Sequence, residues 1–217
     1  MRIEFAYSLE KDIWCLLNKG KSSNNSPNPT KVYQELVLRY GENPTSEETS
    51  KFIEEYLSEN NIDTGECIAR FQKDWEKVAN EYQKRAEAVF QVSLPKKITA
   101  YLTTNNRCPY NIEENYFYVS MSTPSPVVLT IMHELWHFYT WYSLGVSQYE
   151  KLGKERYNDI KESLTVLLNS ECADLFPKGT EDKGYPQHQE MRAKISNMWI
   201  SDKNLQKIIA KLIEFND

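Results

Sequence analysis

Long apolar runs are missing from this chain of 217 residues. No stretch approaches the roughly 18 consecutive apolar residues of a membrane-spanning helix. The first residues, MRIEFAYSLEKDIW, are interrupted by charges at Glu4, Glu10, Lys11 and Asp12 and so lack the apolar centre of a secretory signal. We therefore expect a cytoplasmic protein with no membrane partner.

A basic excess is also missing. The chain has 26 Lys and Arg against 31 Asp and Glu, which gives a formal net charge of −5. Proteins that bind nucleic acid through the phosphate backbone need a basic face. The composition therefore predicts no nucleic-acid partner, and it leaves the oligomeric state open.

Paired cysteines are a third absence. Four cysteines are present, far apart and without a C-x-x-C pair: Cys15, Cys67, Cys108 and Cys172. A zinc site built on cysteine is therefore not expected. Without a secretion signal, reduced thiols are the better interpretation than disulfides.

Helix signals dominate the first part of the chain. Short helices are predicted where a side chain can cap the first turn or a glycine can end the last: Ser8 with Gly20, Thr30 with Gly41, and Thr45 with Glu48. Residues 63–90 then carry apolar positions at three- and four-residue steps, which predicts one long amphipathic helix beginning at Asp63. We expect residues 1–93 to form a helical region packed on a core of residues 94–217.

Strand signals appear in the middle of the chain. Residues 96–104, KKITAYLTT, and 115–121, NYFYVSM, are rich in β-branched and aromatic side chains, and a turn-rich segment separates them. An antiparallel pair is expected. Helices follow: one capped by Ser125 and ending at Gly145, one over residues 155–174, and two closing helices. The fold class is α+β and mostly helical, with a small antiparallel sheet.

The stretch VVLTIMHELWHFYTWY, residues 127–142, carries the chemistry. His133 and His137 are four residues apart, so on a helix they point from one face and can share one tetrahedral Zn²⁺. Glu134 lies beside them and is placed to reach a water rather than the ion. The pattern H-E-L-W-H is an instance of H-E-x-x-H.

The surroundings distinguish this match from a chance one. Residues 127–142 contain no Lys or Arg, and the neighbours of the motif are apolar or aromatic. A helix that is apolar all round is a buried one. A buried Glu and two buried His need a partner or a metal, because desolvating them alone is costly. The stretch therefore predicts a metal centre.

A catalytic zinc needs a third protein ligand. The downstream candidates are Glu150, Glu155, Asp159, Glu162, Glu171, Asp174 and His188. Glu162 precedes an uncharged run, residues 163–170, and is followed by small residues that permit close helix approach. We favour Glu162, with Glu155 as its main rival.

With these residues, the chain resembles the gluzincin metallopeptidases of the thermolysin-like zincin group, and by size the minigluzincins. The resemblance covers roughly residues 96–169 and is specific at H-E-L-W-H. It implies a small sheet before the motif helix, with residues 115–121 as an edge strand that binds extended peptide. The absence of a third-histidine motif and of a Met-turn disfavours a metzincin.

The resemblance implies a zinc-dependent peptidase. His133, His137 and Glu162 would hold Zn²⁺, and Glu134 would be the general base and then the proton donor. Tyr185 or His188 would supply the hydrogen bond to the oxyanion. The family's acidic residue four positions after the ligand glutamate is replaced here by Val166. Support for a zinc histidine is then expected from Asp159, Thr165 or Asn169.

The alternative is a non-enzymatic helical interaction protein with a structural or vestigial metal site. Structural zinc sites fill all four positions, typically with Cys, and none of the four cysteines is close to the motif in sequence. The substrate peptide, the choice between internal and terminal cleavage, and any inhibitory role of the N-terminal region stay open.

Overall fold

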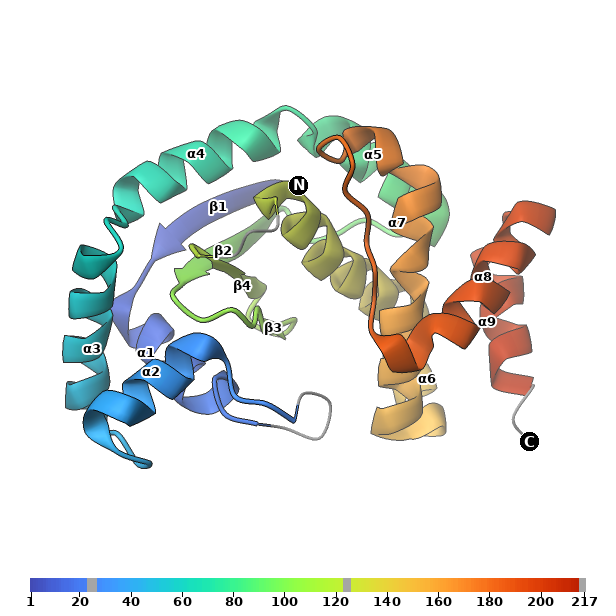
Figure 1. The fold of residues 1–217 in the computed structure, drawn as a ribbon. Helices are drawn as coiled ribbons and strands as arrows, with labels where there is room; N and C mark the ends of the chain where they lie inside the picture. Colours follow the sequence, from blue (N-terminus) through green and yellow to red (C-terminus); the bar gives the residue numbers. More distant parts are fainter. Residues whose placement is uncertain (23–26, 123–125, 215–217) are drawn as a thin grey trace. The chain divides into compact units, whose positions relative to one another are not determined.

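The computed structural model describes residues 1–22, 27–122 and 126–214. The chain forms two compact units, Met1–Glu76 with Pro95–Val127 and Lys77–Leu94 with Val128–Asp217. The division predicted from the sequence, a helical region of residues 1–93 and a core of residues 94–217, stays a prediction. Figure 1 labels the helices and strands of both units.

The sheet of the first unit is mixed rather than antiparallel. Its strand order is β1 (Arg2–Tyr7), β2 (Lys97–Thr103), β4 (Tyr116–Ser120) and β3 (Tyr110–Asn111). The strands β1, β2 and β4 run parallel, and only β3 runs antiparallel to β4. The predicted antiparallel pairing of β2 with β4 is wrong, because the turn-rich segment between them is long enough for a crossover.

Two further expectations about the sheet need correction. β4 is not the outer strand, since β3 pairs with it at Tyr116 and Phe117. β1 was not predicted, because the first residues were considered only as a possible secretion signal. In fact Ile3 and Phe5 alternate with more exposed neighbours and are 2% and 7% exposed, which is the pattern of a strand with one buried face.

The described residues of the first unit also form four helices: α1 (Leu9–Lys19), α2 (Lys31–Tyr40), α3 (Ser46–Glu59) and α4 (Thr64–Glu76). The predicted caps are confirmed. Ser8 and Thr30 each accept a hydrogen bond from the backbone of their first turn, and Thr45 and Glu48 form a capping box. α1, α2 and α3 share one apolar core around Leu16, Leu36 and Phe52.

The single long helix predicted over residues 63–90 is in fact two. α4 ends at Glu76 and α5 (Ala79–Phe90) begins after Val78, whose φ of −120° leaves the helical range. The two helices belong to different compact units. An apolar stripe with helical spacing persists through such a break, so periodicity alone did not reveal it.

α6 (Val127–Leu164) carries the motif and is interrupted twice. Gly145 and Gly153 have φ of 73° and 72°, a conformation that favours glycine, so α6 consists of three helical segments. The predicted end at Gly145 is confirmed, whereas the predicted cap Ser125 lies outside the described residues.

Shorter elements follow α6 in the second unit. They are α7 (Val166–Glu171), the short 3-10 turns η1 (Ala173–Leu175) and η2 (Pro186–His188), and the closing helices α8 (Gln189–Ser201) and α9 (Leu205–Glu214). The helix predicted over residues 155–174 is broken after Leu164. The two closing helices are confirmed.

Aromatic packing fixes the first segment of α6 against α5. The Phe90 ring lies edge-on to Trp136 at 4.8 Å and stacks on Tyr139 at 5.6 Å between ring centroids. The Tyr82 hydroxyl donates to the Met132 carbonyl at 2.9 Å. The motif helix is therefore held in a close-packed setting. No helix in the described ranges is long and apolar enough to cross a membrane.

Candidate metal centre

The first segment of α6 places two imidazoles together. His133 and His137 are one turn apart, and their ring centroids are 4.5 Å apart. Six apolar neighbours are fully buried, as expected for a core helix: Ile131, Met132, Leu135, Trp136, Phe138 and Tyr139. His137 is 2% exposed and Glu134 is 7% exposed. Solvation therefore does not account for these polar side chains.

Glu162, near the end of the third segment of α6, completes a group of three. Its carboxylate oxygens lie 3.7 Å from His133 Nε2 and 3.6 Å from His137 Nε2. The Trp136 indole nitrogen donates to the Leu164 carbonyl at 3.0 Å and ties the two segments together. Glu155, the rival third ligand, is exposed and does not belong to this group.

The spacing of these three groups fits one metal ion. One donor atom from each lies within 4.8 Å of the other two. Ligands about 2.0–2.2 Å from a tetrahedral Zn²⁺ are roughly 3.4 Å from one another, close to the two carboxylate–imidazole distances found here. Two imidazole nitrogens and one carboxylate oxygen are also a donor set that suits zinc.

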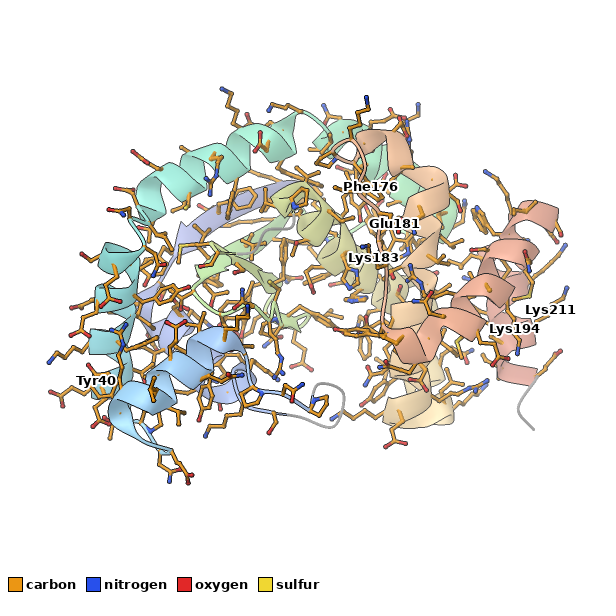
Figure 2. All side chains as sticks on the ribbon, viewed as in Figure 1. Tyr40, Phe176, Glu181, Lys183, Lys194 and Lys211 are labelled. Carbon is orange, nitrogen blue, oxygen red and sulfur yellow. The ribbon has the colours of Figure 1, made fainter. Side chains whose placement is uncertain are left out.

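Asp182 holds His133 in the orientation that such a site needs. Its Oδ2 lies 2.6 Å from His133 Nδ1. A ring that donates from Nδ1 to a carboxylate presents the lone pair of Nε2 on its other side. Asp182 was missed by the sequence analysis. It lies in the segment between η1 and η2, beside α7, where Figure 2 labels its neighbours Glu181 and Lys183.

Asp182 is itself held by three side chains. Thr165 donates to its Oδ1 at 2.8 Å, and Arg192 forms an ion pair with the same oxygen at 2.9 Å. The Asn169 side chain exchanges two hydrogen bonds of 2.8 Å with its backbone. Thr165 and Asn169 were expected to support a zinc histidine, and they act here through Asp182. The carboxylate contact with a histidine that the resemblance implies for position 166 comes here from Asp182.

The segment around Asp182 depends on a glycine. Gly184 has a φ of +59°, and a Cβ there would come within 2.6–2.8 Å of Nη1, Cζ and Cδ of the Arg192 side chain. Arg192 also donates to the Asp182 carbonyl and to the Thr165 hydroxyl. The absence of a side chain at Gly184 therefore permits Arg192 to reach Asp182.

The electrostatics of the group favour a bound cation. Burial alone would lower the pKa of His133, but the carboxylates of Asp182 and Glu162 raise it to about 10, so without metal the ring also carries a proton on Nε2, which a metal ion would displace. Burial, helped by the Lys161 ammonium group, lowers the pKa of His137, which stays neutral with a lone pair. Burial would raise the pKa of Glu162, yet the nearby cations hold it far below its ordinary range. Glu162 is therefore a charged candidate ligand.

Glu134 differs from Glu162 although the two carboxylates are neighbours. Burial raises the pKa of Glu134 to about 8, with the charge of His133 acting in the opposite direction and that of Glu162 adding to the rise. A carboxyl whose pKa lies near neutral pH can both accept and return a proton. The two glutamates therefore suit different roles.

The expected oxyanion donors, Tyr185 and His188, belong to the same unit as the three-residue group. His188 Nε2 is 3.0 Å from Asp159 Oδ1, so Asp159 supports His188 rather than a ligand of the three-residue group. The Nδ1 of His188 is buried and has no hydrogen-bond partner among the described residues. Tyr185 is 44% exposed and its ring lies 5.8 Å from that of His188. Their role as donors stays a prediction.

The comparisons with known proteins add no family. No protein-family model matches the chain, and neither do curated proteins or solved structures. The site geometry alone carries the functional argument.

Proposed function

We propose that the chain is a zinc-dependent peptidase that hydrolyses peptide bonds. The observation that supports this most is the convergence of His133, His137 and Glu162 on one point, with the buried carboxyl of Glu134 next to a ligand histidine. The donor set and the helix spacing are those of the H-E-x-x-H hydrolases. The chain matches no family model, so the proposal rests on this constellation.

The donor count favours a catalytic centre over a structural one. No fourth His, Cys, Asp or Glu joins the group in the part of the chain that the structure describes. Catalytic zinc sites have three protein ligands and one open position, whereas structural sites are closed by four. The side chains of His133 and Glu162 are also 21% and 16% exposed, which leaves solvent a path to the site.

Each residue has a role in this proposal. His133, His137 and Glu162 would hold a divalent ion, which would supply Lewis acidity and lower the pKa of a water toward about 7. Glu134 takes the proton from the attacking water and returns it to the leaving amine, which its pKa near neutral permits. Asp182 fixes the ring of His133. His188, oriented by Asp159, is the candidate hydrogen-bond donor to substrate.

Replacement of the proton carrier tests the proposal. Glu134→Gln keeps size and removes the base, so the purified variant should retain one zinc per chain while cleavage of a mixed peptide library falls by a factor of about 10² or more. Mass spectrometry of the library reports cleavage, and elemental analysis reports zinc. If the wild-type protein bound one zinc per chain but cleaved no peptide, the metal site would stand and the proposed peptidase activity would be refuted.

A further inference from the structure

Lys161 brings a positive charge into the candidate metal centre. Its ammonium nitrogen is 2.8 Å from Glu162 Oε1, and the lysine side chain is only 7% exposed. Lysine is almost never this deeply buried unless it is paired. Lys161 and Glu162 are consecutive residues near the end of the third segment of α6, so the backbone fixes the charge beside the ligand carboxylate.

The other charges of the site already have partners of their own. Asp182 is paired with Arg192 and with His133. Glu162 is ionised. Lys161 is thus the closest cation to the one site carboxylate that a divalent ion would also need.

We propose that Lys161 is a built-in counter-ion of Glu162, which holds the site together without metal and competes with a divalent cation for the same carboxylate. A buried carboxylate left without a partner destabilises a protein strongly. The ammonium group prevents this when no metal is bound. Once a divalent ion is bound, two cations share one carboxylate in a poorly solvated site, and their repulsion weakens metal binding.

This inference rests on the proposed metal site but not on peptidase activity. A different role for Lys161 makes the opposite prediction. If the ammonium group served to hold Glu162 in the position that ligates metal, its removal would weaken metal binding, as loss of a supporting contact does. The sign of the change in affinity separates the two roles.

The test combines metal affinity with stability of the metal-free protein. Lys161→Met keeps the apolar stem and removes the charge, whereas Lys161→Gln keeps a hydrogen-bond donor for Glu162. Zinc affinity is measured by competition with a chromophoric chelator, and thermal unfolding is measured after dialysis against EDTA. We expect both variants to bind Zn²⁺ about tenfold more tightly than wild type and to unfold at lower temperature without metal. Lys161→Met should show the larger loss.

The matched control is Lys203→Met. Lys203 forms an ion pair of the same 2.8 Å length with Glu171, but its side chain is 65% exposed. Exposed ion pairs contribute little, so this variant should change neither quantity. Weaker or unchanged zinc affinity in both Lys161 variants overturns the counter-ion role. Absence of zinc binding in wild type removes the metal site itself, and with it the proposed function.

Discussion

The Oδ2 of Asp182 lies 2.6 Å from Nδ1 of His133, although 49 positions separate the two residues along the chain. The carboxylate fixes the ring of a candidate ligand from outside the ligand set. Such partners orient the imidazole and raise its basicity. We therefore expect the metal affinity of the site to depend on Asp182, a residue outside the ligand set.

Asp182→Asn tests this dependence. The amide keeps the size of the side chain but loses the negative charge shared with His133 and Arg192. We expect zinc affinity to fall about 10- to 100-fold, measured by competition with a chelating dye. Asp174→Asn is the control, since Asp174 pairs with Arg85 at 2.5 Å on the surface of the same unit. Equal affinities in the two variants would contradict the role of Asp182.

Gly184 gives a second test of the same support. Gly184→Ala places a methyl group against the Arg192 guanidinium group and strains a backbone with positive φ. We expect a loss of about 1–3 kcal/mol in unfolding free energy and a weaker zinc affinity. Gly179→Ala separates the two effects, because Gly179 has a φ of +80° with nothing within 4 Å of the added Cβ. This control should lose stability and keep its affinity for zinc.

The parts of the site that were predictable from the sequence are those encoded by local spacing. His133 and His137 share a helix, so their separation follows from helix geometry alone. Glu162 was indicated by the uncharged run that follows it, a local sign of burial. Asp182 has no such sign. It lies in a segment without periodicity, and only tertiary packing through Thr165 and Asn169 brings it to His133.

The fold shows the same division between local and distant information. Capping residues such as Ser8, Thr30 and Thr45 marked helix starts correctly, because a cap involves only neighbouring residues. β4 runs parallel to β2 because of the path that the chain takes between them. The amino-acid composition of the two strands predicts that they are strands but not their relative direction.

Asp12 predicts a pH dependence of stability in the first unit. Burial raises its pKa from 3.8 to about 6, although Thr103 and Thr104 donate hydrogen bonds to it. The folded state therefore binds this proton more tightly than the unfolded chain. The stabilisation is complete below about pH 4 and is lost as the pH rises through 6, an effect of about 3 kcal/mol.

Asp12→Asn isolates this contribution because the amide does not titrate. Urea unfolding of both proteins between pH 4 and pH 8 gives the difference in unfolding free energy at each pH. From pH 4 to pH 8, the unfolding free energy of the variant should rise by about 3 kcal/mol relative to that of the wild type. Two curves that stay parallel over this range would show that the carboxyl of Asp12 titrates alike in both states.

Metal addition decides between the two candidate third ligands. A ligand that binds only the folded state stabilises it by about 2.7 kcal/mol at a free concentration of 100 times Kd, so zinc should raise the unfolding temperature of the EDTA-treated wild type. Glu162→Ala removes one of the three converging donors and should abolish most of this rise. Glu155→Ala alters an exposed residue of the same helix and should retain the rise in full. If the losses were reversed, Glu155 would be the ligand, and the carboxylate found beside His133 and His137 would be a structural partner of Lys161 alone.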